Sequence, residues 1–124
     1  MEPQMMVRTA IVLLALTGAG GLLMAGIRFS GKPHPPTWIA MLHGLLAGAG
    51  VTLLLYAGIT RGLPSPAWAG IVLLVVAAAG GLVMNLHFHW KNIALPIWLV
   101  LVHAAIAVVG LVVLAIAGWN VTGV

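Results

Sequence analysis

Cysteine is absent from this sequence, and Glu2 is its only acidic residue. Without cysteine there are no disulfide bridges, iron–sulfur clusters or thiol chemistry. One carboxylate provides neither a general acid–base pair nor a carboxylate metal site, so any enzymatic activity has to be redox chemistry at a bound cofactor. The five basic residues are scattered and form no patch of the kind that binds nucleic acid. We therefore expect an electron-transfer or structural role rather than a stand-alone catalyst.

Long apolar runs dominate what is present. Hydrophobic residues make up 63% of the 124 residues and charged residues only 5%, which is far outside the range of soluble domains. A membrane-spanning helix needs about 20 mostly apolar residues, and four runs are long enough. They are Val7–Ile27, Pro36–Thr60, Ser65–Leu86 and Leu95–Trp119. Because lipid cannot satisfy free backbone groups and the runs lack the alternation of barrel strands, they predict four transmembrane α-helices in a lipid bilayer.

The two halves of the sequence repeat each other. A shift of 60 residues superposes Ile11–Gly58 on Ile71–Gly118 without a gap, and 17 of the 48 aligned positions are identical. Chance identity in so biased a composition is roughly 5 or 6 positions. Each repeat, about 8–60 and about 68–119, is a two-helix hairpin, so both enter the membrane from the same side. The sequence therefore predicts a single transmembrane domain over residues 1–124, an antiparallel four-helix bundle of two tandem repeats. The repeat also argues that the first span stays in place and is no signal peptide.

Two histidines occupy the same place in both repeats. His43 and His103 each lie five residues after a tryptophan and seven after a proline, inside an apolar run. The positions that the second and fourth spans share are spaced by seven, four, three, four and three residues, which is typical of a heptad seam. Both histidines are therefore predicted to point into the bundle. Sequential packing of the helices would make these two spans diagonal partners.

Two neutral imidazoles that face each other across a bundle suit the iron of one b-type haem, with His43 and His103 as axial ligands. Haem is a flat plate, and paired glycines let it approach the backbone. Arg28, Lys32 and Lys91 are on the side that the propionates would reach. The candidate cofactor-binding residues are Gly20, Gly21, Gly80, Gly81, Met24, Met84, Trp38, Trp98 and Arg28.

Each of these residues also has a simpler interpretation. Glycines in membrane helices often serve close packing, tryptophans anchor at the membrane interface, and methionines fill gaps. A single buried histidine can hydrogen-bond across helices. An inward ionisable residue in a membrane is nevertheless a functional hypothesis by default, and two at matching positions strengthen it.

His87 and His89 end the third span and have no counterpart in the first repeat. They are either interfacial polar residues or a second site: a metal or haem ligand, a quinone hydrogen-bond partner, or a proton acceptor. Residues two apart diverge by about 200° around a regular helix, so both can serve one metal only where the helix is distorted.

Four apolar spans with inward histidines on paired helices, together with the glycine pairs, resemble the membrane b-type cytochromes of the cytochrome b561-like kind. The resemblance implies electron transfer between a haem and a quinone or a partner redox protein. Members commonly carry two haems on four histidines, whereas the single symmetric pair here predicts one.

The connections between the spans are too short to form an extramembrane domain that could bind a soluble electron donor. This favours a small subunit of a larger respiratory or photosynthetic complex, or a homodimer, and we expect it in a bacterial inner membrane. The alternative is a haem-free accessory subunit that packs against membrane partners. A small transporter is less well supported, because no charged side chain lies in the interior of a span, away from its ends.

Overall fold

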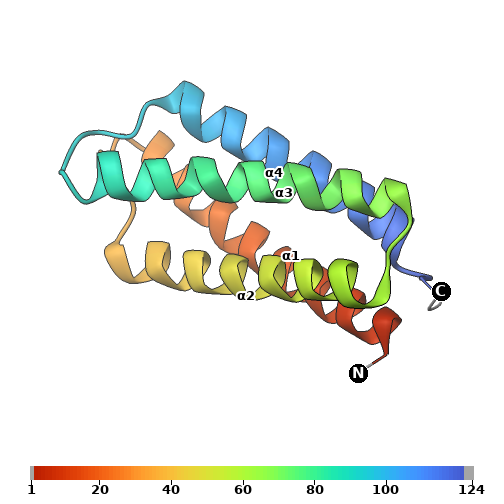
Figure 1. The fold of residues 1–124 in the computed structure, drawn as a ribbon. Coiled ribbons are helices and arrows are strands. Elements are labelled where there is room, and N and C mark those ends of the chain that lie inside the picture. The colour runs from red at the N-terminus through yellow and green to blue at the C-terminus, as the bar shows by residue number, and fades with distance from the viewer. Residues whose placement is uncertain (1, 122–124) are drawn as a thin grey trace.

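In the computed structural model, which describes residues 2–121, the chain forms an antiparallel bundle of four long α-helices (Figure 1). They are α1 (Pro3–Phe29), α2 (Thr37–Arg61), α3 (Ser65–Val83) and α4 (Ile97–Gly118), and α3 runs on into a π-helix, η1 (Met84–His89). Each of the four, with η1 counted as part of α3, is long and apolar enough to cross a membrane. The predicted fold class is confirmed: this is an integral membrane protein built as a four-helix bundle. Residues 1 and 122–124 of the predicted domain lie outside the described part.

Proline and glycine set the limits of the helices. Pro36, Pro64 and Pro96 immediately precede α2, α3 and α4, and Pro3 opens α1. Proline suits these places because its fixed φ matches the first turn, where its missing N–H would have no helical partner. At the end of α2, Gly62 has a φ of 69°, which glycine adopts without steric cost. The spans predicted from apolar length agree with the helices within a few residues, except that the predicted end of the third falls inside η1.

The order of packing follows the order of the chain. Helix α1 packs against α2 and α4, and α3 packs against α2 and α4, so α2 and α4 face each other diagonally. The chain termini lie at one end of the bundle, and the α1–α2 and α3–α4 loops lie at the other (Figure 1). The predicted diagonal placement of the two histidine-bearing helices is confirmed.

The packed core occupies only one half of the bundle. We call the half that carries the termini the terminal half (residues 3–17, 50–61, 65–77 and 110–118), and the rest of the helices the loop half. Apolar side chains of the terminal half form one buried cluster that includes Val7, Leu14, Leu54, Ile71, Leu74 and Leu114. In the helices of the loop half, as far as the structure describes them, Val100 alone is buried.

The space around the glycines also differs between the two halves. A Cβ built on Gly70 would lie 2.9 Å from the carbonyl oxygen of Gly110 and 2.9 Å from the backbone nitrogen of Leu114. Here the backbones of α3 and α4 approach closely, which only small residues allow. In the loop half, a Cβ would meet nothing within 4 Å at five glycines. These are Gly18, Gly20, Gly26, Gly44 and Gly48.

Candidate cofactor site

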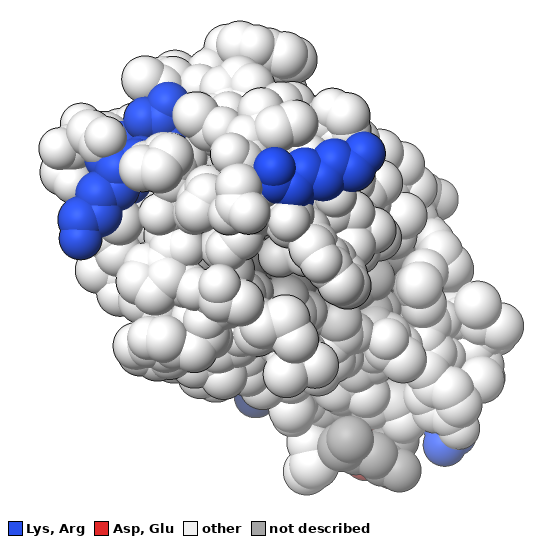
Figure 2. Space-filling view, turned by 90° about the vertical axis from the view of Figure 1, so that its left-hand side faces the viewer, with Lys and Arg blue, Asp and Glu red and all other residues white. Residues whose placement is uncertain are grey.

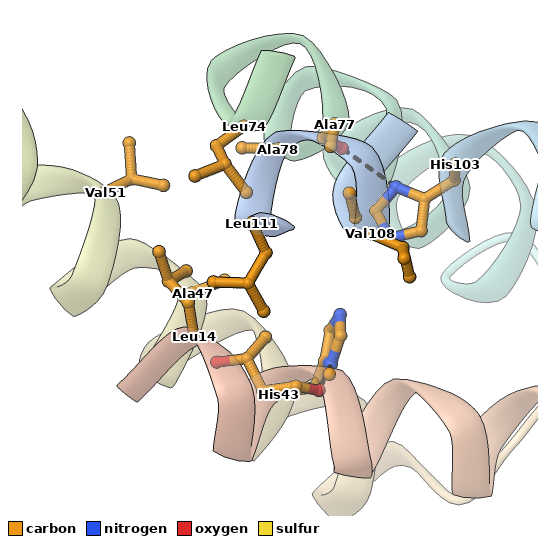
Figure 3. Close-up of a pocket in the computed structure, with 13 residues that line it drawn as sticks. Leu14, His43, Ala47, Val51, Leu74, Ala77, Ala78, His103, Val108 and Leu111 are labelled. Carbon is orange, nitrogen blue, oxygen red and sulfur yellow. Dashed lines mark hydrogen bonds between the residues drawn. The ribbon is translucent and has the colours of Figure 1, made fainter. Parts of the chain in front are cut away.

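The structure brings His43 of α2 and His103 of α4 together in the middle of the bundle. Their ring centroids are 6.3 Å apart, and the ring planes make an angle of 61°. Figure 3 shows the two imidazoles pointing toward each other from opposite sides of the interior. Both histidines therefore face inward, on the side that the heptad spacing indicates.

One nitrogen of each ring is held by the backbone of the neighbouring helix. The Nδ1 atom of His43 lies 2.9 Å from the carbonyl oxygen of Thr17, and Nδ1 of His103 lies 2.9 Å from that of Ala77. A carbonyl can only accept, so Nδ1 carries the proton and donates it in both rings. Each Nε2 is then left with a free lone pair, which is the tautomer that metal-binding histidines adopt when a carbonyl holds their other nitrogen. The two acceptors are themselves 60 residues apart, in line with the predicted repeat.

Glycines on α1 and α3 make room for the rings. A Cβ on Gly21 would lie 3.0 Å from Cε1 of His43, and one on Gly81 would lie 3.3 Å from Cε1 of His103. Each imidazole thus rests against the bare backbone of the neighbouring helix. A Cβ on Gly80 would lie 3.8 Å from Nδ1 of His103, whereas one on Gly20 would meet nothing within 4 Å. The glycines were predicted to admit a flat cofactor, and the contact that Gly21 and Gly81 make is with the histidine rings.

A cavity of about 90 Å³ adjoins the two histidines. Its walls come from all four helices and are apolar or small apart from Thr17 and the histidines themselves (Figure 3). Leu14, Leu74 and Leu111 separate it from the core of the terminal half. The lone pairs of the two Nε2 atoms are therefore surrounded largely by hydrocarbon.

Two predicted lining residues do not reach this cavity. Trp38 and Trp98 are 69% and 65% exposed, and neither lines it. Five residues correspond to about 140° around a helix, so each tryptophan projects away from the histidine that follows it. The predicted pocket role of the two tryptophans stays a prediction, and their exposure also fits interfacial anchoring. Met24 and Met84 are half-buried in the loop half and also do not line the cavity.

Arg28 has a different set of partners from the predicted propionates. Its Nε donates to the carbonyl oxygen of Leu95 at 2.8 Å, and its Nη1 donates to that of Lys32 at 3.3 Å. The guanidinium therefore joins the two loops at the loop end of the bundle.

The structure separates His87 from His89 and gives His89 an unforeseen partner. His89 stacks on His34, with centroids 4.7 Å apart and planes 18° from parallel, and its Nε2 lies 3.2 Å from Oγ1 of Thr37. His87 packs edge-on against Phe88 instead. His34 lies in a loop and has no counterpart in the second repeat, so no sequence pattern marked it as a partner.

The donor set at His43 and His103 restricts what the pair can hold. Within residues 2–121, no group of three or more histidine, cysteine, aspartate or glutamate side chains is placed to hold a metal ion. A metal between these two rings would thus have two protein ligands. Bonds of about 2.0–2.1 Å to each Nε2, plus half the width of each ring, separate the ring centroids by roughly 6 Å. The observed 6.3 Å matches that arrangement.

The space around the pair also bears on the fit of a flat macrocycle. The cavity alone is smaller than the roughly 300–1,000 Å³ of ordinary cofactor pockets. On the other side of the histidines lies the loop half, where the helices have almost no buried side chains between them. The two histidines fit the iron of a haem as donors, whereas its macrocycle would need room beyond this cavity, between the α1–α2 and α3–α4 hairpins.

Comparison of the chain with known protein families, curated proteins and solved structures finds no match.

Proposed function

We propose that the protein is a membrane b-type cytochrome, in which His43 and His103 are the axial ligands of one haem and the bound haem carries electrons. The observation that carries this proposal is the pair of opposed imidazoles, each with its Nδ1–H donated to a backbone carbonyl. This arrangement orients both rings and leaves both Nε2 lone pairs available.

The number of ligands favours haem over a bare ion. Structural zinc sites take four protein ligands and catalytic ones three, whereas this pair supplies two. A haem brings four equatorial nitrogens of its own and needs only axial ligands from the protein. With both axial positions taken by histidine, no position stays open for oxygen chemistry, which favours electron transfer.

The bound haem would supply one-electron chemistry, and the residues of the chain would set its surroundings. The carbonyls of Thr17 and Ala77 raise the basicity of the imidazoles through their hydrogen bonds. The leucines and alanines of the cavity wall keep water away from the iron site. A low-polarity site of this kind makes the potential depend on axial ligands and hydrogen bonds.

The short connections between helices suggest where electrons come from. The loops span residues 30–36, 62–64 and 90–96, so the described chain offers no extramembrane domain for a soluble donor. We propose that the protein lies in a bacterial inner membrane, as a small subunit of a larger respiratory or photosynthetic complex or as a homodimer. A quinone or a neighbouring redox subunit would exchange electrons with the haem.

Absorption spectroscopy of the purified full chain from haem-replete cells tests the proposal. We expect a six-coordinate, low-spin b-type spectrum with a sharp α band after dithionite reduction. His43→Ala and His103→Ala should each abolish it, whereas His87→Ala, on the exposed end of η1, should leave it intact. Colourless protein would favour a haem-free accessory subunit instead. Equal loss in all three variants would refute the ligand assignment.

Chemical rescue separates ligation from folding. His43→Gly leaves space where the ring was, so added imidazole should restore the low-spin spectrum in this variant. Far-UV circular dichroism should show unchanged helix content throughout. A folded variant that imidazole cannot rescue would argue against His43 as a ligand.

A further inference from the structure

The two hairpins are joined at the loop end by polar contacts. The backbone N–H of Leu95 donates to the carbonyl oxygen of Pro33 at 3.0 Å, and Arg28 donates to the carbonyl oxygen of Leu95. These bonds connect the α1–α2 loop to the α3–α4 loop. The helices below them have almost no buried side chains, so closure of this end depends on the loop contacts rather than on a core.

The stacked pair His34–His89 belongs to the same set of contacts. His34 comes from the α1–α2 loop and His89 from the end of η1, so the stack crosses from one hairpin to the other. Thr37 at the start of α2 holds Nε2 of His89 at 3.2 Å. The π-helical geometry of η1 has no counterpart in α1, which stays α-helical to Phe29. This is therefore a feature of one hairpin that the repeat does not explain.

The charge around the pair has one sign. Figure 2 faces this end of the bundle and shows basic side chains across its upper part with no acidic ones among them. Glu2, the only acidic residue in the sequence, precedes α1 at the other end. The titratable or charged groups near the pair, taken from each element, are Arg28 of α1, Lys32 of the α1–α2 loop, His87 of η1 and Lys91 after it.

We propose that His34 and His89 form a proton-controlled latch between the hairpins. With both imidazoles neutral, the stack and the Thr37 bond hold the loop end closed. Protonation at low pH would place positive charge on the pair, and no carboxylate side chain of the described residues lies at this end of the bundle to offset it. Repulsion within the pair, and from Lys32 and Lys91, then separates the α1–α2 loop from η1 and opens the loop half to water.

The size of the pH effect on the latch can be estimated from the distance between the two imidazole rings. Two unit charges 4.7 Å apart in a partly exposed site repel each other by an amount that changes an equilibrium roughly tenfold. The inference does not require a haem, because it concerns the loop contacts alone. Its failure would leave the proposed function untouched, and a colourless protein would leave the latch untouched.

Distance measurements between spin labels test the latch directly. Since the chain has no native cysteine, Ser30→Cys and Ile93→Cys can carry labels on the two loops of the full protein in lipid nanodiscs. We expect a single short distance at pH 8 and a longer population that grows about tenfold, reversibly, by pH 5. A second label pair at Met5 and Ile116, on α1 and α4 of the terminal half, should show no change.

Matched variants assign the response to the pair. His89→Gln keeps an amide that can bond Thr37 but cannot take up a proton in this range, so the pH response should disappear. His34→Gln should have the same effect and serves as the second variant if one of them folds poorly. His87→Gln, on the same π-helix but outside the pair, should retain the full response. An unchanged distance in the parent protein, or a pH response in His89→Gln and His34→Gln as large as that of the parent, would overturn the proposal.

Discussion

The same four helices are packed tightly in the terminal half of the bundle and loosely in the loop half. Leu54 and Leu114 are fully buried in the terminal half, whereas Val100 alone is buried among the described helix residues of the loop half. Glycines follow the same division: Gly70 and Gly110 bring backbones together, while Gly44 and Gly48 face open space.

The difference in packing indicates that the two halves of the bundle contribute differently to stability. In a bilayer, helix association depends on close packing rather than on escape from water, so the terminal half supplies most of the stability. Side chains that are only half-buried make fewer close contacts and gain less dispersion energy, so the loop half contributes less. The histidine pair lies at the boundary between the two regions. The proposed cofactor would therefore rest against the packed half.

The largest effect should come from cutting into the packed core. Leu54→Ala removes a side chain with no exposed surface and should destabilise the protein by about 2–5 kcal/mol. Unfolding in mixed micelles of increasing SDS fraction measures the change. The matched substitution Leu46→Ala, at a half-buried position of the loop half on the inward side of the same helix, should shift the midpoint much less. Similar losses at both positions would show that the loop half is packed as well.

Adding a methyl group to a glycine should also change the stability of the protein differently in the two halves. Gly70→Ala places a Cβ against the backbone of α4 and should destabilise the protein by about 1–3 kcal/mol in the same assay. Gly48→Ala meets nothing within 4 Å and should be neutral or stabilising by up to about 1 kcal/mol, since alanine favours helix. A loss at Gly48 would reveal a packing partner on that face of α2.

A substitution next to His43 should have the smallest effect on stability but a specific effect on haem binding. Gly21→Ala brings a methyl group to about 3 Å from Cε1 of His43, so the ring has to shift by a few tenths of an ångström. Haem occupancy, read from the reduced α band, should fall while helix content stays the same. Gly26→Ala, on the same helix with nothing within 4 Å of the added Cβ, is the control and should keep full occupancy. Equal occupancy in both would mean that Gly21 does not seat the ring.

Much of the fold was predictable because it depends on local properties. The length of the apolar runs predicts the four helices and, within a few residues, their limits. The heptad spacing predicts that His43 and His103 share the interior. The origin of the two hairpins as repeats stays a prediction. Their equivalent Nδ1 bonds agree with it, whereas η1 marks a place where the hairpins differ.

Other features could not be predicted, because they depend on residues far apart in the sequence. The exposure of Trp38 depends on how α2 turns in the bundle, which its constant spacing to His43 does not predict. His34 carries no repeat or period that links it to His89, and only the meeting of the two loops brings them together. The cofactor role of Arg28 stays a prediction, and its hydrogen bond to the carbonyl oxygen of Leu95, 67 residues away, appears only in the structure.

The sequence by itself determined that this chain spans a membrane four times and presents two histidines to its interior, because hydrophobic length and helical period are properties of each segment alone. Only the tertiary structure decided which nitrogen of each ring stays free, which glycines seat the rings, and which half of the bundle has a core. Those outcomes depend on the distances between helices, and such distances arise only when all four have packed together.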